Sequence, residues 1–331
     1  METRKPVTMS DLARDLGISR SAVSFALNNE SQVSRETRER VIAKAAELGY
    51  RPNAGARALA GQKTDLFGLV TDIVSTPFGG DLIAGAQEWF WSHGKSLLIA
   101  GTSTPERPDA RSIEMMLEHR VGGILLATTW NRAIELPSSL AHVPVVLVHC
   151  FDARGERPSV LPDEVEGGRA AAQMLIDAGR RRIAMINLPP DMVAARGRRH
   201  GFEDALTNAG IEADRDLIVT SGPEADSAYL AAHDLLSRHE VDGVFCANDR
   251  IAMGTYDAAR DLGLAIPRDL AVVGFDNQEI IASYLRPALS TVALPFREMG
   301  RRGAELLTRT HDGDHLEQIV VPCPPIVRDS V

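Results

Sequence analysis

A short stretch near the N-terminus carries side chains that can read DNA bases from one face of a helix. At 100° per residue, residues 20–28 place an apolar stripe on one side and a more polar set on the other. Hydroxyls, amides and a guanidinium can bond to base edges, and an aromatic ring can contact a thymine methyl group. The apolar stripe is Ala22, Val23, Ala26 and Leu27. The opposite face holds Ser21, Ser24, Phe25 and Asn28, with Arg20 at its margin.

The residues around this face predict a helix-turn-helix. A first helix begins near Thr8, a tight turn spans 16–19, and Ser19 is suited to cap the second helix. The second helix of this motif lies in the major groove, with its positive end towards the phosphates. The alternative is an ordinary surface hairpin of two helices. Phe25 argues against it, because a large apolar side chain is unfavourable on a solvated face.

A third helix and a short fourth helix are expected next. Ser34 is a suitable N-cap, apolar residues recur at helical spacing over 41–48, and Gly49 suits the C-terminal end. Pro52 and Gly61 bound a helix of roughly two turns, and isolated helices below ~12 residues are marginal in water. This segment must therefore form against DNA, a second copy of the chain, or both.

The remainder of the chain alternates strands with helices. Repeated β-α order predicts an α/β fold with parallel sheets covered by helices on both faces. A proline-rich break at 158–162 suggests two lobes. Strands are expected at Leu66–Val70, Leu97–Ala100, Gly123–Ala127, Val145–Val148, Ile183–Ile186, Val244–Ala247 and Leu270–Phe275, and helices at about 81–92, 110–119, 164–178, 200–209, 227–238 and 249–262.

A second set of residues suits a small polar ligand. Asn248 and Asp276 each come near the end of a predicted strand, where ligands bind in such folds. An amide, a carboxylate, the guanidinium of Arg198 and the flat face of Phe78 together suit vicinal hydroxyls, as in a sugar. Asp276 could instead be a turn former. Asp249 is expected to cap the following helix rather than to contact a ligand.

Charge is divided unevenly along the chain. Residues 1–63 hold eleven Lys and Arg against seven Asp and Glu, a net charge of +4. The whole chain carries −9, so residues 64–331 carry −13. A basic head on an acidic body confines the attraction for phosphates to the head. The alternative for the head taken alone is an ordinary solvated surface.

Composition narrows the function classes. No run of 18 apolar residues predicts a membrane span, and no signal peptide is apparent, so a cytoplasmic protein is expected. The cysteines, Cys150, Cys246 and Cys323, have no CxxC spacing and suit buried thiols in a reducing compartment. Phosphate-loop, dinucleotide, zinc-protease and serine-hydrolase motifs are missing, so neither a catalytic residue nor a cofactor is expected. The polar segment 311–315 suits a turn better than a metal site.

Several motifs in combination resemble the lac repressor (LacI/GalR) family of bacterial transcription regulators. In the N-terminal part they are 7–13, 17–24, 33–41, 48–53 and Leu59-Ala60. In the remainder they are Ser75-Thr76-Pro77-Phe78, Arg198-Arg199-His200-Gly201-Phe202 opening a helix, Cys246-Ala247-Asn248-Asp249, Val272-Val273-Gly274-Phe275-Asp276, and Val327-Arg328-Asp329-Ser330 in a last strand. The resemblance covers essentially the whole chain.

The resemblance implies a helix-turn-helix headpiece over 1–50, a hinge helix and linker over 51–63, and an effector-binding and dimerisation domain over 64–331. This last domain resembles the two-lobed type I periplasmic binding proteins. Its lobes are expected at 64–161 with 296–322, and at 162–292 with 323–331.

The resemblance also implies a homodimer on a palindromic operator. The Leu59 side chain is then a wedge that inserts between bases in the minor groove, although simple burial between domains is an alternative. No leucine heptad follows the last strand, so a dimer rather than a tetramer is expected. Beyond the reading face, the expected DNA contacts are Thr8, Ser19, Ser34, Asn53, Ala56, Arg57 and Leu59.

By family position, the expected effector contacts are Phe78, His149, Arg198, Asn248 and Asp276, with Trp130 and Asp226 as further lining residues. His149 could equally be a structural residue. The chain departs from relatives at Phe25, where several have arginine, and at Gly79 and Leu294 in the expected cleft. Because of these departures, neither the operator sequence nor the effector of a relative is transferred to this chain.

The expected function is a ligand-responsive transcription regulator, most simply a repressor, whose effector is a sugar or sugar derivative. A sugar-binding transport component would explain the body but not the DNA-reading head. An enzyme joined to a DNA-binding module would need an activated nucleophile or a metal, and neither is recognisable in the sequence.

Overall fold

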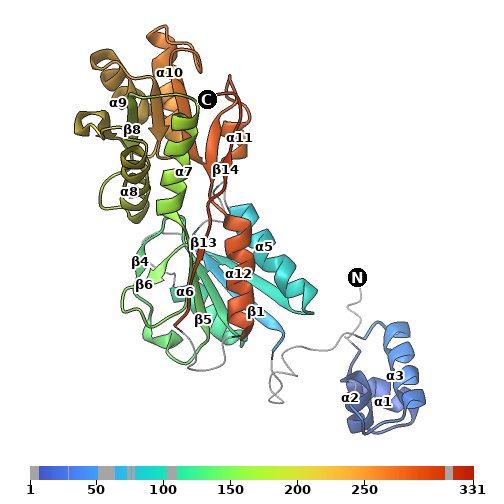
Figure 1. The fold of residues 1–331 in the computed structure, drawn as a ribbon. Coiled ribbons are helices and arrows are strands. Elements are labelled where there is room, and N and C mark those ends of the chain that lie inside the picture. The colour runs from blue at the N-terminus through green and yellow to red at the C-terminus, as the bar shows by residue number, and fades with distance from the viewer. Residues whose placement is uncertain are drawn as a thin grey trace. The chain divides into compact units, whose positions relative to one another are not determined.

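The computed structural model describes residues 7–28, 30–50, 64–72, 76, 79–102, 110–309 and 316–331. The expected hinge helix lies outside the described residues, as do Phe78 and the polar segment 311–315. The chain divides into two compact units, Met1–Thr64 and Asp65–Val331. They are described separately below as the headpiece and the body (Figure 1).

The described residues of the headpiece form the helices α1 (Met9–Leu16), α2 (Arg20–Leu27) and α3 (Arg35–Glu47). Each begins at a side-chain cap. Thr8 and Asp11 form a reciprocal capping box, the Ser19 hydroxyl accepts from the Ala22 amide at 3.0 Å, and Ser34 accepts from Thr37 at 3.2 Å. Gly17 ends α1 with a φ of 66°, so the expected turn is confirmed. The core of this unit consists of Leu12, Ala13, Val23, Ala26, Val41 and Ala45.

The first lobe of the body is built on a six-stranded parallel sheet. The strand order is β13-β7-β5-β3-β1-β2, so the C-terminal strand β13 lies at one edge of a sheet made mostly from the N-terminal half of the body. Helices α5, α6 and α12 flank it (Figure 1). The bounds are β1 Leu66–Thr71, α5 Gly79–Ser92, β2 Ser96–Gly101, α6 Ala110–Glu118, β3 Ile124–Ala127, β5 Val145–Val148, β7 Ser159–Pro162, α12 Phe296–Arg309 and β13 Gln318–Val321, with a small pair β4 (Ala133–Ile134) and β6 (Phe151–Asp152), and a 3-10 turn at Ser138–Leu140.

The second lobe has a similar sheet, in the order β14-β12-β11-β10-β8-β9, parallel except for β14. Its core is formed by the inner faces of the sheet and the helices that cover it. The bounds are α7 Glu164–Asp177, β8 Ile183–Asn187, α8 Val193–Asn208, β9 Ile218–Thr220, α9 Ala225–Arg238, β10 Gly243–Cys246, α10 Asp249–Asp261, β11 Ala271–Asp276, α11 Glu279–Ala282, β12 Ser290–Ala293 and β14 Pro325–Ile326, with a 3-10 turn at Arg215–Leu217.

The chain passes between the lobes three times, from β7 to α7, from β12 to α12 and from β13 to β14. The crossing segments are joined to one another: the Asp163 amide donates to the Val321 carbonyl at 2.9 Å, and the Ala293 amide donates to the Pro324 carbonyl at 2.9 Å. Leu294 packs against the cores of both lobes. Two sheets joined by three crossings can pivot about these segments, as a domain hinge requires.

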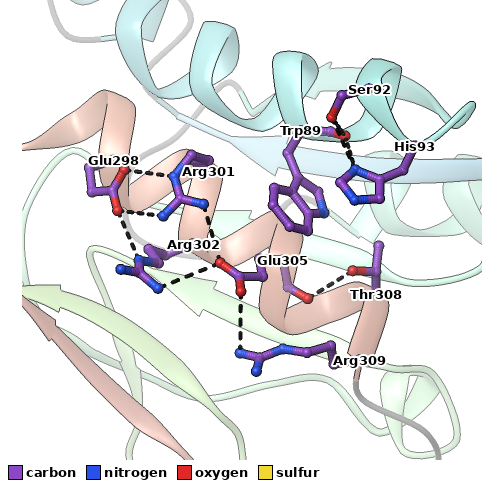
Figure 2. Close-up of polar contacts among 9 residues, drawn as sticks. All are labelled: Trp89, Ser92, His93, Glu298, Arg301, Arg302, Glu305, Thr308 and Arg309. Carbon is purple, nitrogen blue, oxygen red and sulfur yellow. Dashed lines mark hydrogen bonds and ion pairs between the residues drawn. The ribbon is translucent and has the colours of Figure 1, made fainter.

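A ladder of ion pairs runs along the outer face of α12 (Figure 2). Glu298 faces Arg301 and Arg302, and Glu305 faces Arg301, Arg302 and Arg309. The opposite face of α12 packs on α5, where a Cβ at Gly300 would clash with the Leu82 carbonyl. Two carboxylates pair with three arginines, so this face keeps a net charge of +1, and its pairs at i, i+3 and i, i+4 stabilise the helix.

The α/β fold with alternating strands and helices is confirmed, and three local predictions are wrong. The proline-rich segment 158–162 is not a break but strand β7, between β5 and β13. The helix expected at 200–209 begins at Val193, so Arg198 lies inside it rather than at its start. Residues 327–330 are not a strand, since β14 ends at Ile326.

Candidate functional site

The reading face of the headpiece is open in the structure. The side chains of Arg20 and Ser21 are exposed, and the Arg20 guanidinium makes neither a hydrogen bond nor an ion pair with a described residue. The Nδ2 of Asn28 donates a long hydrogen bond of 3.5 Å to the Oγ of Ser24. Phe25 is partly exposed and is not among the side chains that pack on the headpiece core. The face therefore offers one free cation, three small polar groups and one aromatic ring.

Thr8, Ser19 and Ser34 all have cap roles, so each lies at the N-terminus of a helix, where backbone amides and the helix dipole favour a phosphate. Asn53, Ala56, Arg57 and Leu59 lie outside the described residues.

In the second lobe, Arg198 is the centre of a buried charge cluster. Its Nε donates to a Glu164 carboxylate oxygen at 2.7 Å, and its Nη1 donates to the Ala247 carbonyl and lies 3.6 Å from Asp276 Oδ1. The guanidinium also lies over the ring of Phe275, 3.7 Å from its centroid. An arginine that is only 3% exposed with these partners is held in one position, pointing to the carboxyl ends of β10 and β11.

Small residues bring Arg198 to this position. Helices α7 and α8 cross closely enough that a Cβ at Gly168 would clash with the Arg198 backbone, and one at Gly201 would clash with the Val165 carbonyl. Glycine at both sites lets the helix backbones approach. Glu164 at the start of α7 can therefore reach Arg198 inside α8.

Asp276 lies in a strained loop. Asp276 and Asn277 have positive φ angles of 100° and 54°, in a region that side chains other than glycine seldom adopt. The loop is held by Asp249, whose carboxylate accepts from the Gln278 amide and from the Thr291 hydroxyl, both at 2.6 Å. Arg328 Nη2 also donates to the Asn277 side chain at 2.7 Å. The expectation that Asp249 caps α10 is wrong, because Asn248 is the N-cap and Asp249 is buried behind the loop.

The first lobe places a matching polar set at the carboxyl ends of β1, β3 and β5. Asp72 accepts from the Thr129 amide at 2.7 Å and from its hydroxyl at 3.0 Å. The Arg132 guanidinium lies 3.5 Å from the second Asp72 oxygen. His149 is buried, with Nδ1 3.0 Å from the Thr128 carbonyl and its ring edge-on to Phe296.

His149 is close enough to both sets for their charges to influence its pKa. Its protonation is influenced by the charges of Glu164 and Arg198 in the second lobe and of Arg132 in the first. Burial lowers the pKa of His149, and Glu164 offsets this only in part, so the imidazole is neutral at pH 7. The polar ends of both sheets therefore contribute to one neighbourhood.

Several buried side-chain atoms in this neighbourhood accept no hydrogen bond from a described residue. Burying such groups without partners is costly, so they are candidates for contact with a ligand or with ordered water. They are Asp72 Oδ2 and Asn131 Oδ1 in the first lobe, and Glu164 Oε1 and Gln278 Oε1 in the second.

Burial also shifts the pKa values of the acids. Desolvation raises the pKa of Asp72 despite its hydrogen bonds with Thr129. For Asp276, burial outweighs the attraction of Arg198 and raises the pKa to about 7. For Asp249, burial and the neighbouring Asp276 raise the pKa well above the usual value. Glu164, Asp249 and Asp276 thus share a buried region with one fully buried cation, Arg198.

The predicted effector residues are only partly brought together. Arg198 lies 3.6 Å from Asp276, and the charge of Arg198 contributes to lowering the pKa of His149. The Asn248 side chain is already engaged, accepting from the Ile251 amide at 2.7 Å and donating to the Pro223 carbonyl at 3.1 Å. Asp226 is exposed and accepts from the neighbouring Ser227 amide.

Trp130 is partly exposed and follows the end of β3, where its carbonyl accepts from the Thr128 hydroxyl.

Four residues of the site were not predicted from the sequence: Asp72, Asn131, Glu164 and Gln278. A position in the loop after a predicted strand was an available signal, two residues past the strand for Asp72 and four for Asn131. Local sequence held no signal for Glu164 or Gln278, whose roles depend on partners far along the chain.

Among the described residues, no group of three or more His, Cys, Asp or Glu is arranged to hold a metal ion. No helix that the structure describes is both long and apolar enough to cross a membrane. All three cysteines are buried free thiols, as expected.

Comparisons with known proteins agree with this arrangement. Residues 8–53 match the family described as bacterial regulatory proteins, lacI family, and residues 172–331 match the periplasmic binding protein-like domain. The chain is 32% identical over 330 residues to the ribose operon repressor of Haemophilus influenzae, covering 98% of each chain.

Two solved structures extend the likeness to three dimensions. A complex of the transcriptional regulator CelR with cellobiose has a TM-score of 0.67 and 31% identity, over 98% of this chain and 100% of that one. A lac repressor dimer bound to operator and the anti-inducer ONPF has a TM-score of 0.81 and 26% identity, over 98% and 99%.

Fold and site together define a DNA-binding headpiece joined to a two-lobed ligand-binding body. The chain belongs to the lac repressor family of bacterial regulators, and it is a ligand-responsive DNA-binding repressor.

Proposed function

We propose that this protein acts as a cytoplasmic homodimer on a palindromic operator, and that an uncharged sugar or sugar derivative bound between the lobes changes its affinity for DNA. The proposed organisation is a headpiece over 1–50, a hinge over 51–63 and an effector domain over 64–331. The protein performs no chemical reaction in this account, and it needs neither a cofactor nor a metal.

The observation that carries the proposal is the set of buried side-chain oxygens, at the ends of both sheets, that accept no hydrogen bond from a described residue. Asp72, Asn131, Glu164 and Gln278 all present acceptor oxygens. A ligand rich in hydroxyls donates to such acceptors and accepts from guanidinium groups at the same time. A polyhydroxylated molecule is therefore the chemical class that satisfies this neighbourhood best.

Charge pairing argues against an anionic effector. Among the described residues of the site, the guanidinium of Arg132 faces Asp72 and that of Arg198 faces Glu164 and Asp276. A phosphate or carboxylate would have to compete with these carboxylates for each arginine. An uncharged ligand bonds to the pairs without separating them.

Exposed apolar side chains on the body support a dimer. The exposed fractions are 63% for Trp91, 68% for Leu230, 68% for Ile280 and 71% for Tyr284. Ile280 lies on α11 (Glu279–Ala282), and Tyr284 lies in the turn that follows it. We place a second copy against these side chains, because association would remove their apolar surface from water.

The relatives bear on the ligand class. CelR is a regulator solved with cellobiose, and the Haemophilus influenzae relative is a ribose operon repressor. Both names refer to sugars. The lac repressor structure is a dimer on its operator. These precedents favour the sugar, the dimer and the operator proposed here.

A panel of neutral sugars, sugar phosphates and sugar acids tests the proposal by thermal unfolding of the full chain. A neutral sugar at ~100 times its dissociation constant should stabilise the protein by ~2.7 kcal/mol. The variant Asp276→Asn should lose most of this effect, and Asp234→Asn, on the exposed surface of α9, should retain it. Stabilisation by phosphorylated sugars alone would overturn the proposed ligand class.

A further inference from the structure

We infer that Phe25 reads the 5-methyl group of a pyrimidine in the major groove, which makes the chain a sensor of methylation at that base position. The inference rests on the proposed function, because it assumes that α2 enters the groove of an operator. It goes beyond that function by naming the chemical group that one side chain recognises.

The first observation is the surroundings of the Phe25 ring. Phe25 belongs to α2, whose buried side chains are Val23 and Ala26. The apolar side chains that pack around the headpiece core come from all three helices, and Phe25 is not one of them. The ring is partly exposed and makes no stacking contact with a described aromatic residue. Part of the ring is therefore buried by the headpiece, and the rest of its apolar surface is open to solvent.

The second observation is the chemistry of its neighbours. One helical turn from Phe25, Ser21 is exposed, and Ser24 is paired with Asn28. Arg20 supplies the free guanidinium at the N-terminal end of the same helix. Phe25 is therefore the one large apolar group in a row of side chains that can form hydrogen bonds with bases.

Base chemistry then identifies the partner. In the major groove, adenine, guanine and cytosine present hydrogen-bonding groups, and thymine adds a methyl group at C5. A phenyl ring desolvates donors and acceptors without replacing their hydrogen bonds, which is unfavourable, but it gains by covering a methyl group. The same methyl group is present on 5-methylcytosine. The ring should thus favour thymine or 5-methylcytosine over cytosine or uracil.

The test uses the full-length protein and an operator selected from random palindromic DNA. Each thymine of the half-site is replaced in turn by deoxyuridine, which removes only the methyl group. At one position, and its symmetry mate, the substitution should weaken binding about four-fold per half-site, since one buried methyl group corresponds to ~0.8 kcal/mol. A change from thymine to cytosine there should weaken binding further, and 5-methylcytosine should recover the methyl contribution.

Variants identify the side chain responsible. Phe25→Ala should bind the thymine and deoxyuridine operators equally at the sensitive position, whereas Phe25→Leu should retain part of the difference. Ile42→Ala removes a different large apolar side chain of the headpiece, one that is 53% exposed on α3. It should leave the methyl dependence unchanged. The far-ultraviolet circular dichroism of all three variants should match that of the parent.

The outcomes separate this inference from the proposed function. If the protein selects a palindrome but no position shows a methyl dependence that Phe25→Ala abolishes, the inference is overturned and the operator-binding function stands. If no sequence is selected from the random pool, both are overturned.

Discussion

Arg198 shows how one residue can serve both stability and recognition. It is buried, lies over Phe275 and is shared between Glu164 and Asp276. Removing one member of such a cluster leaves a buried charge without a partner, which typically costs ~3–5 kcal/mol. A loss of effector response on mutating Arg198 would therefore say little about ligand contact. Asp276 is the more informative residue.

The pKa of Asp276 makes a specific prediction about pH. Burial raises its pKa to about 7, and the neighbouring Glu164 adds to the rise, while Arg198, Gln278 and Arg250 oppose it. A sugar hydroxyl that donates to the carboxylate stabilises its charged form, so binding releases a proton. Affinity should then increase as pH rises from about 6 to about 8.

Calorimetry at pH 6, 7 and 8, in two buffers of different ionisation enthalpy, measures both the affinity and the proton released. Asp276→Asn should show weaker binding with little dependence on pH. An affinity that is constant over this range in the parent protein would contradict the assignment of Asp276 to the ligand.

Arg20 carries the corresponding prediction for DNA. Its guanidinium has no partner among the described residues, so it is available to a base without breaking an existing contact. Arg20→Ala should weaken specific binding by ~1–3 kcal/mol and relax preference at one operator position. Phe25→Arg should change base preference more than affinity for random DNA. If both variants retain the parent preference across a panel of operators, the assignment of the reading face is wrong.

At the scale of elements, sequence was most informative where structure is decided locally. Ser19 and Ser34 cap their helices as predicted, and Gly17 has the left-handed conformation that a glycine turn allows. These features depend on a few neighbouring residues. The β-α alternation of the body was predictable for the same reason, since the period of apolar residues changes with each element.

Predictions failed where distant partners decide the outcome. Strand β7 is flanked by prolines, but Ser159, Val160 and Leu161 between them are free to pair. The Ser159 amide donates to the Glu317 carbonyl, and the Val160 carbonyl accepts from His149. Asp249 and Asn248 are both suitable caps. Asn248 is the cap, and Asp249 instead accepts from the Gln278 amide and from Thr291, which is 42 positions along the chain.

The crossing of α7 and α8 gives a prediction at this scale. Gly201→Ala would place a methyl group against the Val165 carbonyl, forcing apart the helices that carry Glu164 and Arg198. Overpacking of this kind typically costs ~1–3 kcal/mol. Chemical unfolding should show this loss, together with weaker effector binding. Gly80→Ala is the matched control, because a Cβ there meets no atom within 4 Å. Equal stability of the two variants would contradict the role given to this crossing.

At the scale of the molecule, the proposed dimer can be tested through its exposed apolar surface. Tyr284→Asp places a charge on a side chain that is 71% exposed, in the turn after α11. If this surface is buried in the dimer, the dissociation constant should rise at least ~10-fold, equivalent to ~1.4 kcal/mol. Leu316→Asp, at a residue 69% exposed near β13, should have little effect. Sedimentation over a concentration series distinguishes these outcomes, and unchanged association of Tyr284→Asp would place the interface elsewhere.

Charge and coupling are also properties of the whole chain. An acidic body of −13 joined to a head of +4 limits attraction for random DNA to the head. In the proposed function, the effector acts on DNA affinity by changing how the two lobes pivot. Allosteric coupling of this kind is typically ~1–3 kcal/mol, or roughly 5–150-fold in affinity.

The central claim is that a neutral sugar in the body and an operator on the headpiece are linked through one equilibrium. It is tested by measuring operator affinity with and without saturating sugar, and sugar affinity with and without saturating operator, on the same dimer at one salt concentration. Linkage requires the two ratios to be equal, and the account predicts a common factor of roughly 5–150. If sugar and operator both bind but the affinity of either is the same with and without the other, the central claim is contradicted.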